Sequence, residues 1–324
     1  MNFLGLQMQT KEIKKAKNGV FTAETSISEE GAYVTTLHGI KDFSVHKTFD
    51  CGQCFRFEPV ADSAYDEEFA GVAFGRYISV ARSGENIYIY NCDGDFFSSR
   101  IRDFLSLDTD YGAIREDILS RCQTEYMKNA SEAGNGIHIL AQDKWEALCS
   151  FIISQNNNIP RIKKIIRALS ETCGERAEAD GMEKHGAREC EYSFPSAEKV
   201  ASLGEDGLKA LRVGFRASYI YDAATKALSG ELDLERTAAL DTENCIAELC
   251  RVRGVGMKVA SCTALFGMKK YDAFPIDVWI KRVLAENFPK GFDPKTLGGY
   301  AGIAQQYMFY AARFDNDKDN DKDK

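Results

Sequence analysis

A Gly-Val-Gly turn at residues 254–256, set between two short helical patterns, is the feature that most constrains how this chain can fold. Apolar residues recur at helical spacing over 243–252, where we expect Thr242 to be the N-cap, and again over 258–266. The two glycines permit backbone angles that other residues resist. The sequence therefore predicts two helices joined by a tight hairpin over about residues 243–266.

The residue types around this turn suit chemistry on a nucleic acid. Amides at the start of the second helix, next to Gly254 and Gly256, can hold a phosphate at the positive end of the helix dipole. Lys258 lies in the first turn, where an amine can attack a sugar carbon if its surroundings disfavour the charged form. Asp277, downstream, can stabilise the positive charge that develops on that sugar. Together these features favour removal of a base from DNA followed by opening of the backbone.

Each of these features also has a plain structural explanation. The hairpin alone fits a tight helix–helix turn with a solvated lysine, or a DNA-binding module without chemistry. Pro275 holds Phe274 extended, so Asp277 is also a natural N-cap for a helix that begins at Val278. The two roles of the aspartate are compatible, because a capping carboxylate is fixed in place and ionised.

Composition sets wider limits. The 324 residues suffice for two domains, and the formal net charge of −8 argues only mildly against a nucleic-acid partner, since phosphate binding needs a local basic patch. The sequence has no apolar run of membrane-spanning length, and residues 1–20 do not resemble a secretory signal. We therefore expect no membrane partner and a cytoplasmic location, in the nucleoid of a prokaryote-like cell or in a nucleus.

Ten cysteines raise the question of a metal or redox site. Several fall at apolar positions of helical patterns, where cysteine acts as a small hydrophobic residue. Cys51 and Cys54 form the only C-x-x-C pair, without a second pair at zinc spacing. Residues 55–57 continue with strand-like alternation, which disfavours a thioredoxin-like site, although thiol–disulfide exchange stays open as a minor alternative. We predict no metal and no cofactor.

The periodicity changes from β to helical along the chain. Strands are expected at 33–38, 53–57, 69–74, 77–82 and 87–90, the last two joined by a turn at 83–86. A polar loop is expected at 171–192, and helices at 145–152, 159–169, 197–203, 206–213, 217–228, 243–252, 258–266, 278–288 and 300–314. The predicted fold class is α+β, an N-terminal antiparallel β-sheet domain packed on an all-helical domain. The expected divisions are a 1–19 N-terminal extension, a 20–134 β-rich domain, a 135–314 helical domain and a disordered acidic tail at 315–324.

Four separated segments resemble the 8-oxoguanine DNA glycosylase/lyase family of the helix-hairpin-helix superfamily. They are Cys51-Gly52-Gln53-Cys54-Phe55-Arg56, Ser154-Gln155-Asn156-Asn157-Asn158-Ile159-Pro160-Arg161, Gly254–Cys262 with Pro275-Ile276-Asp277-Val278, and Tyr300-Ala301-Gly302-Ile303-Ala304-Gln305 with Phe309. Their order and approximate spacing match the family from about residue 20 to residue 314. The hairpin with its aspartate is shared across the superfamily, whereas the first two segments are specific to this branch.

The resemblance implies a bifunctional mechanism and a pocket for an extruded base. Lys258 is expected to attack C1′ and form a Schiff base that permits β-elimination, with Asp277 stabilising the sugar cation. The damaged base is expected to lie between Phe309 and Cys262, with Gln305 on its Watson–Crick edge. The carbonyl of Gly52 would accept the N7–H that oxidised guanine carries and guanine lacks.

Other matching positions are implied to contact the duplex. Asn156 would fill the hole left by the extruded base, and Phe215 would act as a wedge. Arg161 and Arg216 would read the cytosine left behind. The implied partner is double-stranded DNA containing oxidised guanine, bound by a monomer. Glycosylases for other oxidised or alkylated bases, using the same lysine, remain an alternative.

Three positions depart from the family pattern, and one of them is Phe215, which stands where tyrosine is common. Arg253 stands where proline usually precedes the first glycine, which adds a possible phosphate contact. Trp279 stands where animal and fungal members tend to carry histidine, so a DNA contact changes there and the opposite-base preference is expected to loosen. No cysteine follows Cys262, and we therefore predict no iron–sulfur cluster.

Overall fold

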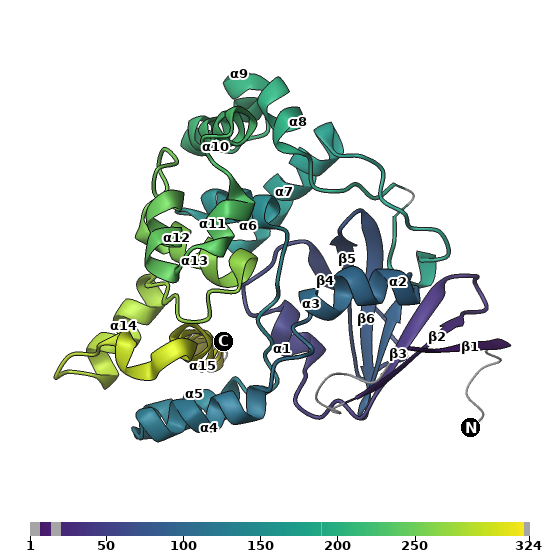
Figure 1. Ribbon diagram of the computed structural model, residues 1–324, viewed down its shortest axis with the longest axis horizontal. Helices are drawn as coiled ribbons and strands as arrows, with labels where there is room; N and C mark the ends of the chain where they lie inside the picture. The colour runs from purple at the N-terminus through teal and green to yellow at the C-terminus, as the bar shows by residue number, and fades with distance from the viewer. Residues whose placement is uncertain (1–6, 14–20, 189, 321–324) are drawn as a thin grey trace.

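The computed structural model describes residues 7–13, 21–188 and 190–320, and it places one β-sheet beside a larger body of helices (Figure 1). This confirms the predicted α+β class. Within the described residues, no helix is both long enough and apolar enough to cross a lipid bilayer.

The sheet has seven antiparallel strands in the order β1-β2-β3-β7-β6-β5-β4. The strands are β1 (Gln7–Ile13), β2 (Thr22–Ile27), β3 (Tyr33–His38), β4 (Phe57–Pro59), β5 (Glu67–Ala73), β6 (Arg76–Ser83) and β7 (Asn86–Tyr90). The predicted hairpin is confirmed, since β6 pairs with β7 and Ser83 lies opposite Asn86 at the turn. β1 falls within the expected N-terminal extension and adds an edge strand to the sheet.

Helical segments fill the rest of the described chain. They are α1 (Val45–Phe49), α2 (Gly94–Phe96), the π-helical η1 (Phe97–Ile101), α3 (Arg102–Phe104), α4 (Tyr111–Arg121), α5 (Glu125–Ala133), α6 (Lys144–Ser154), α7 (Ile159–Cys173), η2 (Glu183–His185), α8 (Ala197–Ser202), α9 (Gly204–Ala210), η3 (Gly214–Arg216), α10 (Ala217–Ser229), α11 (Leu234–Ala239), α12 (Thr242–Leu249), α13 (Met257–Met268), α14 (Val278–Asn287), η4 (Pro294–Tyr300) and α15 (Ala301–Asn320).

Alternating strand residues give the sheet two buried faces. One face carries Ile78, Ile87 and Ile89, which pack with Phe49 of α1 and Phe104 of α3. In Figure 1, α2 and α3 lie across this sheet. Because both faces are covered, neither shows the apolar-in, polar-out pattern of a half-exposed sheet.

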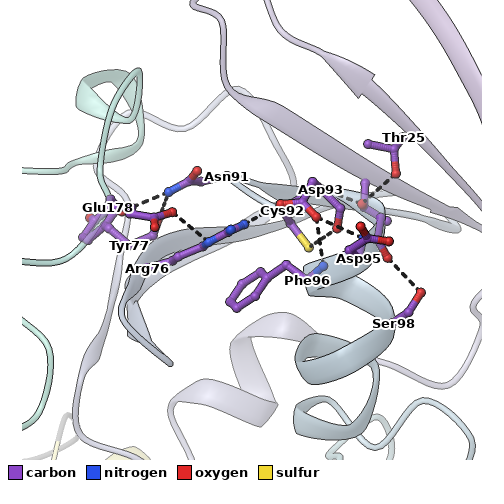
Figure 2. Close-up of polar contacts among 12 residues, drawn as sticks. Thr25, Arg76, Tyr77, Asn91, Cys92, Asp93, Asp95, Phe96, Ser98 and Glu178 are labelled. Carbon is purple, nitrogen blue, oxygen red and sulfur yellow. Dashed lines mark hydrogen bonds and ion pairs between the residues drawn. The ribbon is translucent and has the colours of Figure 1, made fainter.

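The segment predicted as a polar loop at 171–192 covers the other face. Met182 is fully buried there beside Tyr77 and Val72. Arg76 pairs with the Glu178 carboxylate at 2.9 Å, and the Tyr77 amide donates to the Glu178 carbonyl at 2.8 Å. Figure 2 shows these contacts together with Asn91, whose side-chain amide donates to the carbonyls of Tyr77 and Glu178. The segment therefore ties the sheet to the end of α7.

The helical core is built around α13, where every residue from Val259 to Met268 is buried. Glycine at 267 lets α6 approach closely, because a Cβ there would meet the Ala147 side chain at 2.9 Å. Residues Tyr111 to Ala130 of α4 and α5 contribute to this same core. The packing of the helical body therefore begins before residue 135.

Several local expectations were wrong. Residues 53–56 form turns rather than a strand, because the Gln53 side chain is buried and bonded to loop backbone groups. Asp241, not Thr242, caps α12 by accepting from the Asn244 amide at 2.9 Å. Helix α15 continues to Asn320, so the first part of the tail expected to be disordered is helical. Extending an existing helix costs far less free energy than starting one. Residues 321–324 lie outside the described residues.

We expect the buried Gln53 side chain to be a main determinant of stability. Its truncation to alanine leaves the carbonyls of Thr48 and His138 and the amide of Leu140 without their partner. Since each unpaired buried group costs about 1–3 kcal/mol, the free energy of unfolding should fall by roughly 3 kcal/mol or more in urea denaturation. Gln123→Ala, which truncates an exposed glutamine, should change it by less than about 0.5 kcal/mol. Equal midpoints for the two variants would contradict this expectation.

Candidate active site

The two glycines of the hairpin have different physical roles. Gly254 has φ +73° in the left-handed region, and a Cβ there would lie 2.3 Å from the Tyr219 ring of α10. Gly256 has an extended backbone with φ −100° and ψ 178°, and a Cβ there would meet nothing within 4 Å. Gly254 is therefore required by the fold, whereas Gly256 leaves open space at the exposed N-terminus of α13.

Lys258 is the second residue of α13 and is half-buried. Its Nζ lies 5.8 Å from the centroid of the Phe151 ring, which belongs to α6. One turn later on α13, the buried Cys262 thiol lies within hydrogen-bonding and electrostatic range of the lysine. The half-buried amine thus lies beside two buried side chains, Phe151 and Cys262.

Asp277 is the N-cap of α14, as predicted, and its carboxylate accepts from the Ile280 amide at 2.9 Å. Burial raises the pKa of the Cys262 thiol to about 11; Lys258 acts to lower this pKa, and Asp277 acts to raise it. The lysine and the aspartate therefore both lie around the same buried thiol. The fold therefore places the expected nucleophile and the expected carboxylate near Cys262, an expected residue of the base pocket.

The other residues expected to line the base pocket lie on the 51–54 loop and on α15. Gly52 has φ +77°, and a Cβ there would lie 3.5 Å from the Phe309 ring. Gln305, one helical turn before Phe309, is 4% exposed, and its Oε1 has no hydrogen-bond partner among the described residues. A buried acceptor without a partner marks a position where a ligand can donate.

Amide side chains that the sequence analysis did not single out hold this loop. Gln306 donates to the Cys51 carbonyl at 2.8 Å, and Gln142 donates to the Gln53 carbonyl at 2.7 Å. The Gln53 side chain itself bonds to three backbone groups, at Thr48 of α1 and at His138 and Leu140 of the loop before α6. No sequence signal separates the bracing Gln306 from the adjacent Gln305, because α15 buries both.

Asn156 lies at the turn between α6 and α7, exposed and with φ +46°. Asparagine tolerates this left-handed backbone better than most residues do. The turn is held by Arg216, which donates to the carbonyl of Gln155 from Nε at 2.7 Å and to that of Asn156 from Nη2 at 3.0 Å. The left-handed backbone at Asn156 is thus held in place by the buried Arg216 side chain.

Arg216 does not occupy the exposed position expected of a residue that reads a base. It is 2% exposed, and burial, followed by repulsion from Arg161, lowers the pKa of its guanidinium. By contrast, Arg161 is exposed, and its Nη2 donates to the Arg212 carbonyl at 3.4 Å. Phe215 is 52% exposed beside Tyr219, as expected of a wedge.

Trp279 and Arg253, the two positions at which DNA contacts are expected to differ from the family, are both at least partly exposed. Trp279 is half-buried on α14, with the Arg282 guanidinium 5.5 Å from its ring. Arg253 is exposed, and its backbone amide donates to Asp222 at 2.8 Å. A cavity of about 720 Å³ lies elsewhere, between the turn after β5 and the first turn of α6, and none of the candidate site residues lines it.

The Cys51/Cys54 pair lacks the features of a reactive dithiol. Both residues are buried, and burial raises the pKa of Cys51 to about 12 and holds that of Cys54 well above the usual range for a thiol. Because the thiolate is the reactive form, this environment opposes exchange. Within the described ranges, no group of three or more His, Cys, Asp or Glu side chains is arranged to hold a metal ion.

We expect Cys51 and Cys54 to resist iodoacetamide in the native protein at neutral pH, while the partly exposed Cys122 reacts. Peptide mass spectrometry measures the extent of labelling at each position, and urea-unfolded protein gives the complete reaction. Rapid native labelling of Cys54 would restore thiol–disulfide exchange as a candidate function.

We expect opposite outcomes for the two hairpin glycines. Gly254→Ala forces a left-handed backbone and a collision with Tyr219, so the free energy of unfolding should fall by roughly 2–4 kcal/mol. Gly256→Ala should change it by less than about 1 kcal/mol, yet weaken duplex DNA binding by placing a methyl group in the open space before α13. Denaturant titration and fluorescence anisotropy measure the two quantities. Undiminished DNA binding by Gly256→Ala would remove the hairpin from the interface.

Comparison with known proteins agrees with this geometry. A model of the 8-oxoguanine DNA glycosylase N-terminal domain matches residues 37–148, and one of the HhH-GPD superfamily of base excision DNA repair proteins matches residues 149–290. The N-glycosylase/DNA lyase OGG1 of Arabidopsis thaliana is 28% identical over 291 residues, which cover 82% of this chain and 76% of that protein.

Solved structures extend the likeness to the whole described fold. The Clostridium acetobutylicum 8-oxoguanine glycosylase/lyase, bound to duplex DNA with cytosine opposite 8-oxoguanine, is 34% identical with a TM-score of 0.79. The match covers 95% of this chain and 99% of that one. The 3-methyladenine DNA glycosylase of Archaeoglobus fulgidus, 17% identical with a TM-score of 0.61, shares the fold alone. With both domains matched in order and the hairpin, lysine and capping aspartate in place, the chain belongs to the 8-oxoguanine DNA glycosylase/lyase family of base excision repair enzymes.

Proposed function

We propose that this protein excises 8-oxoguanine from duplex DNA, with a preference for cytosine opposite the lesion, and then opens the strand by β-elimination. The observation that carries the proposal is the half-buried Lys258 amine, which lies 5.8 Å from the centroid of the Phe151 ring and beside the buried Cys262 thiol, whose pKa also responds to Asp277. A DNA-binding module without chemistry does not need an amine beside a buried thiol with a carboxylate near it.

In the proposed reaction, the Lys258 amine attacks C1′ of the extruded nucleotide. The glycosidic bond breaks, and its electron pair leaves with the base, which takes up a proton. The Asp277 carboxylate stabilises the positive charge that develops on the sugar. The secondary amine then opens the sugar ring to a Schiff base, and loss of a C2′ proton expels the 3′ phosphate. Hydrolysis of the imine returns the free lysine.

Recognition of the lesion follows from the two pocket walls. The left-handed turn at Gly52 lies against Phe309, which supports the proposal that its carbonyl accepts the N7–H of the oxidised base. The unpartnered Oε1 of Gln305 suits the N–H donors of the Watson–Crick edge. Undamaged guanine would set an N7 lone pair against the carbonyl, a mismatch that costs about 1–3 kcal/mol in a buried site.

Residues of the α6–α7 turn serve the rest of the duplex in this proposal. Asn156 fills the gap in the stack, and the exposed Arg161 reaches the cytosine on the opposite strand. Arg216 positions the turn through its bonds to the carbonyls of Gln155 and Asn156. Trp279 occupies the rim of the duplex-binding surface on α14.

Lys258→Gln should abolish both base release and borohydride-trapped covalent adducts, because glutamine cannot form an imine. The assay is incubation with duplexes that carry one 8-oxoguanine opposite each base in turn, with and without borohydride. Lys281→Gln, which removes an exposed lysine of α14, is the control and should react as the wild type does. Full adduct formation by Lys258→Gln would refute the assignment of the nucleophile.

Asp277→Asn separates capping from catalysis. Asparagine caps a helix as well as aspartate does, so stability should change by less than about 1 kcal/mol. Loss of the negative charge should slow base release by about 10²–10³-fold, the usual effect of removing one transition-state electrostatic contact. Asp241→Asn, at the cap of α12, is the matched control, expected to have the wild-type rate. A wild-type rate for Asp277→Asn would limit that residue to capping.

The same panel of duplexes tests the alternatives. Release of an alkylated base or an oxidised pyrimidine, with 8-oxoguanine left intact, would assign the site to another lesion. Binding without release of any base, and equal for damaged and undamaged duplexes, would indicate a DNA-binding module.

A further inference from the structure

Helix α7 carries a concentration of positive charge next to the α6–α7 turn. Its residues 159–170 include Arg161, Lys163, Lys164 and Arg167 and contain no aspartate or glutamate. In a chain with a formal net charge of −8, such a run is a strong local exception. The positive end of the α7 dipole is the N-terminus of the helix, which follows closely after Asn156.

Only part of this charge is neutralised within the protein. Lys163 donates to the Glu58 carboxylate at 2.7 Å and to the Phe57 carbonyl at 3.0 Å, so it links α7 to the sheet. Arg161, Lys164 and Arg167, at intervals of three residues, are exposed and have no ion-pair partner among the described residues.

A fourth cation extends this surface. Arg212 is exposed, its side chain has no ion-pair partner in the described part of the chain, and its carbonyl accepts from Arg161. We call Arg161, Lys164, Arg167 and Arg212 the α7 ridge. Because Arg212 lies just before η3, the ridge adjoins the exposed Phe215 as well as Asn156.

A groove of about 580 Å³ runs along the ridge. It is lined by Glu58, Ile159, Pro160, Lys163, Lys164, Arg167, Ala168 and Glu171. Its two carboxylates already have partners, Lys163 for Glu58 and Arg188, at 2.9 Å, for Glu171. The uncompensated charge of the groove is therefore positive.

We infer that Lys164, Arg167 and Arg212 of the α7 ridge bind the phosphate backbone of the duplex arm on one side of the lesion, with Arg161 at the end of the ridge next to the cytosine. This inference rests on the proposed function for its ligand, duplex DNA, and adds a binding surface outside the base pocket. Arg161 and Arg167 are about 9 Å apart along the helix axis. Since successive base pairs rise about 3.4 Å, the ridge spans about three base pairs of that arm.

Salt dependence of binding tests the inference. Each phosphate contact contributes about 0.9 to the slope of log affinity against log salt concentration, so Lys164→Gln/Arg167→Gln should make that slope shallower by about 1.8. Binding is measured by fluorescence anisotropy on a duplex with a tetrahydrofuran abasic site, which the enzyme cannot process. The two arms of the duplex are then shortened in turn. For one of them, shortening should give the variant and the wild type the same salt slope.

The matched control is Lys41→Gln/Lys128→Gln, which removes the same charge from exposed sites near α1 and on α5, away from α7 (Figure 1). Its slope should equal that of the wild type. An unchanged salt slope in the ridge variant would overturn the inference. A loss of affinity that stays the same whichever arm is shortened would also overturn it, because such a loss reflects the overall charge of the protein and not contact with one arm.

The outcome is separable from that of the proposed function. Base release in a single turnover at saturating enzyme should be unchanged in the ridge variant, since the ridge does not touch the pocket. If no base is released by either protein, the catalytic proposal fails, while the arm-dependent salt slope still decides the role of the ridge.

Discussion

The site depends on a polar seam in which buried amide side chains hold the 51–54 loop between the sheet and the helices. Gln53 bonds to backbone groups on both sides of this seam, and Gln306 and Gln142 fix the carbonyls that flank Gly52. A loop alone would not hold a single carbonyl still, because its backbone groups would exchange with water. Burial makes these bonds costly to break, so the direction of the Gly52 carbonyl is set by the fold.

The proposed catalytic pair, Lys258 and Asp277, shows how a helix terminus can serve structure and chemistry together. The Asp277 carboxylate caps α14, and this bond fixes its position without neutralising it. Lys258 lies at the start of another helix, with its amine near the Phe151 ring and the Cys262 thiol. Both groups are therefore held by secondary structure packed into the core, which limits the reorganisation that a charged transition state would require.

The charge distribution explains how an acidic protein can bind a polyanion. The ion pairs within the described residues, such as the link between Lys163 and Glu58, leave the α7 ridge uncompensated. In the proposed complex, the hairpin and the ridge would contact phosphates of the duplex at two separate places. A duplex held at two places is easier to bend and open between them.

The sequence by itself determined the elements that rest on local chemistry. Periodicity gave the two helices of the hairpin, the turn chemistry gave β6 and β7, and the dipeptide Pro275-Ile276 before Asp277 gave the cap of α14. It also gave the order of the motifs, from which the family could be expected.

Only the tertiary structure decided which side chains meet and which are enclosed. It set Tyr219 against Gly254, buried Arg216 as the brace of the Asn156 turn, and turned residues 53–56 from an expected strand into a bonded loop. The physical reason is that burial and hydrogen-bond satisfaction are properties of segments far apart in the chain. The sequence around Gln53 would be the same whether its side chain were exposed or buried. The packing of the two domains is what buries it and bonds it to the carbonyls of His138 and Thr48.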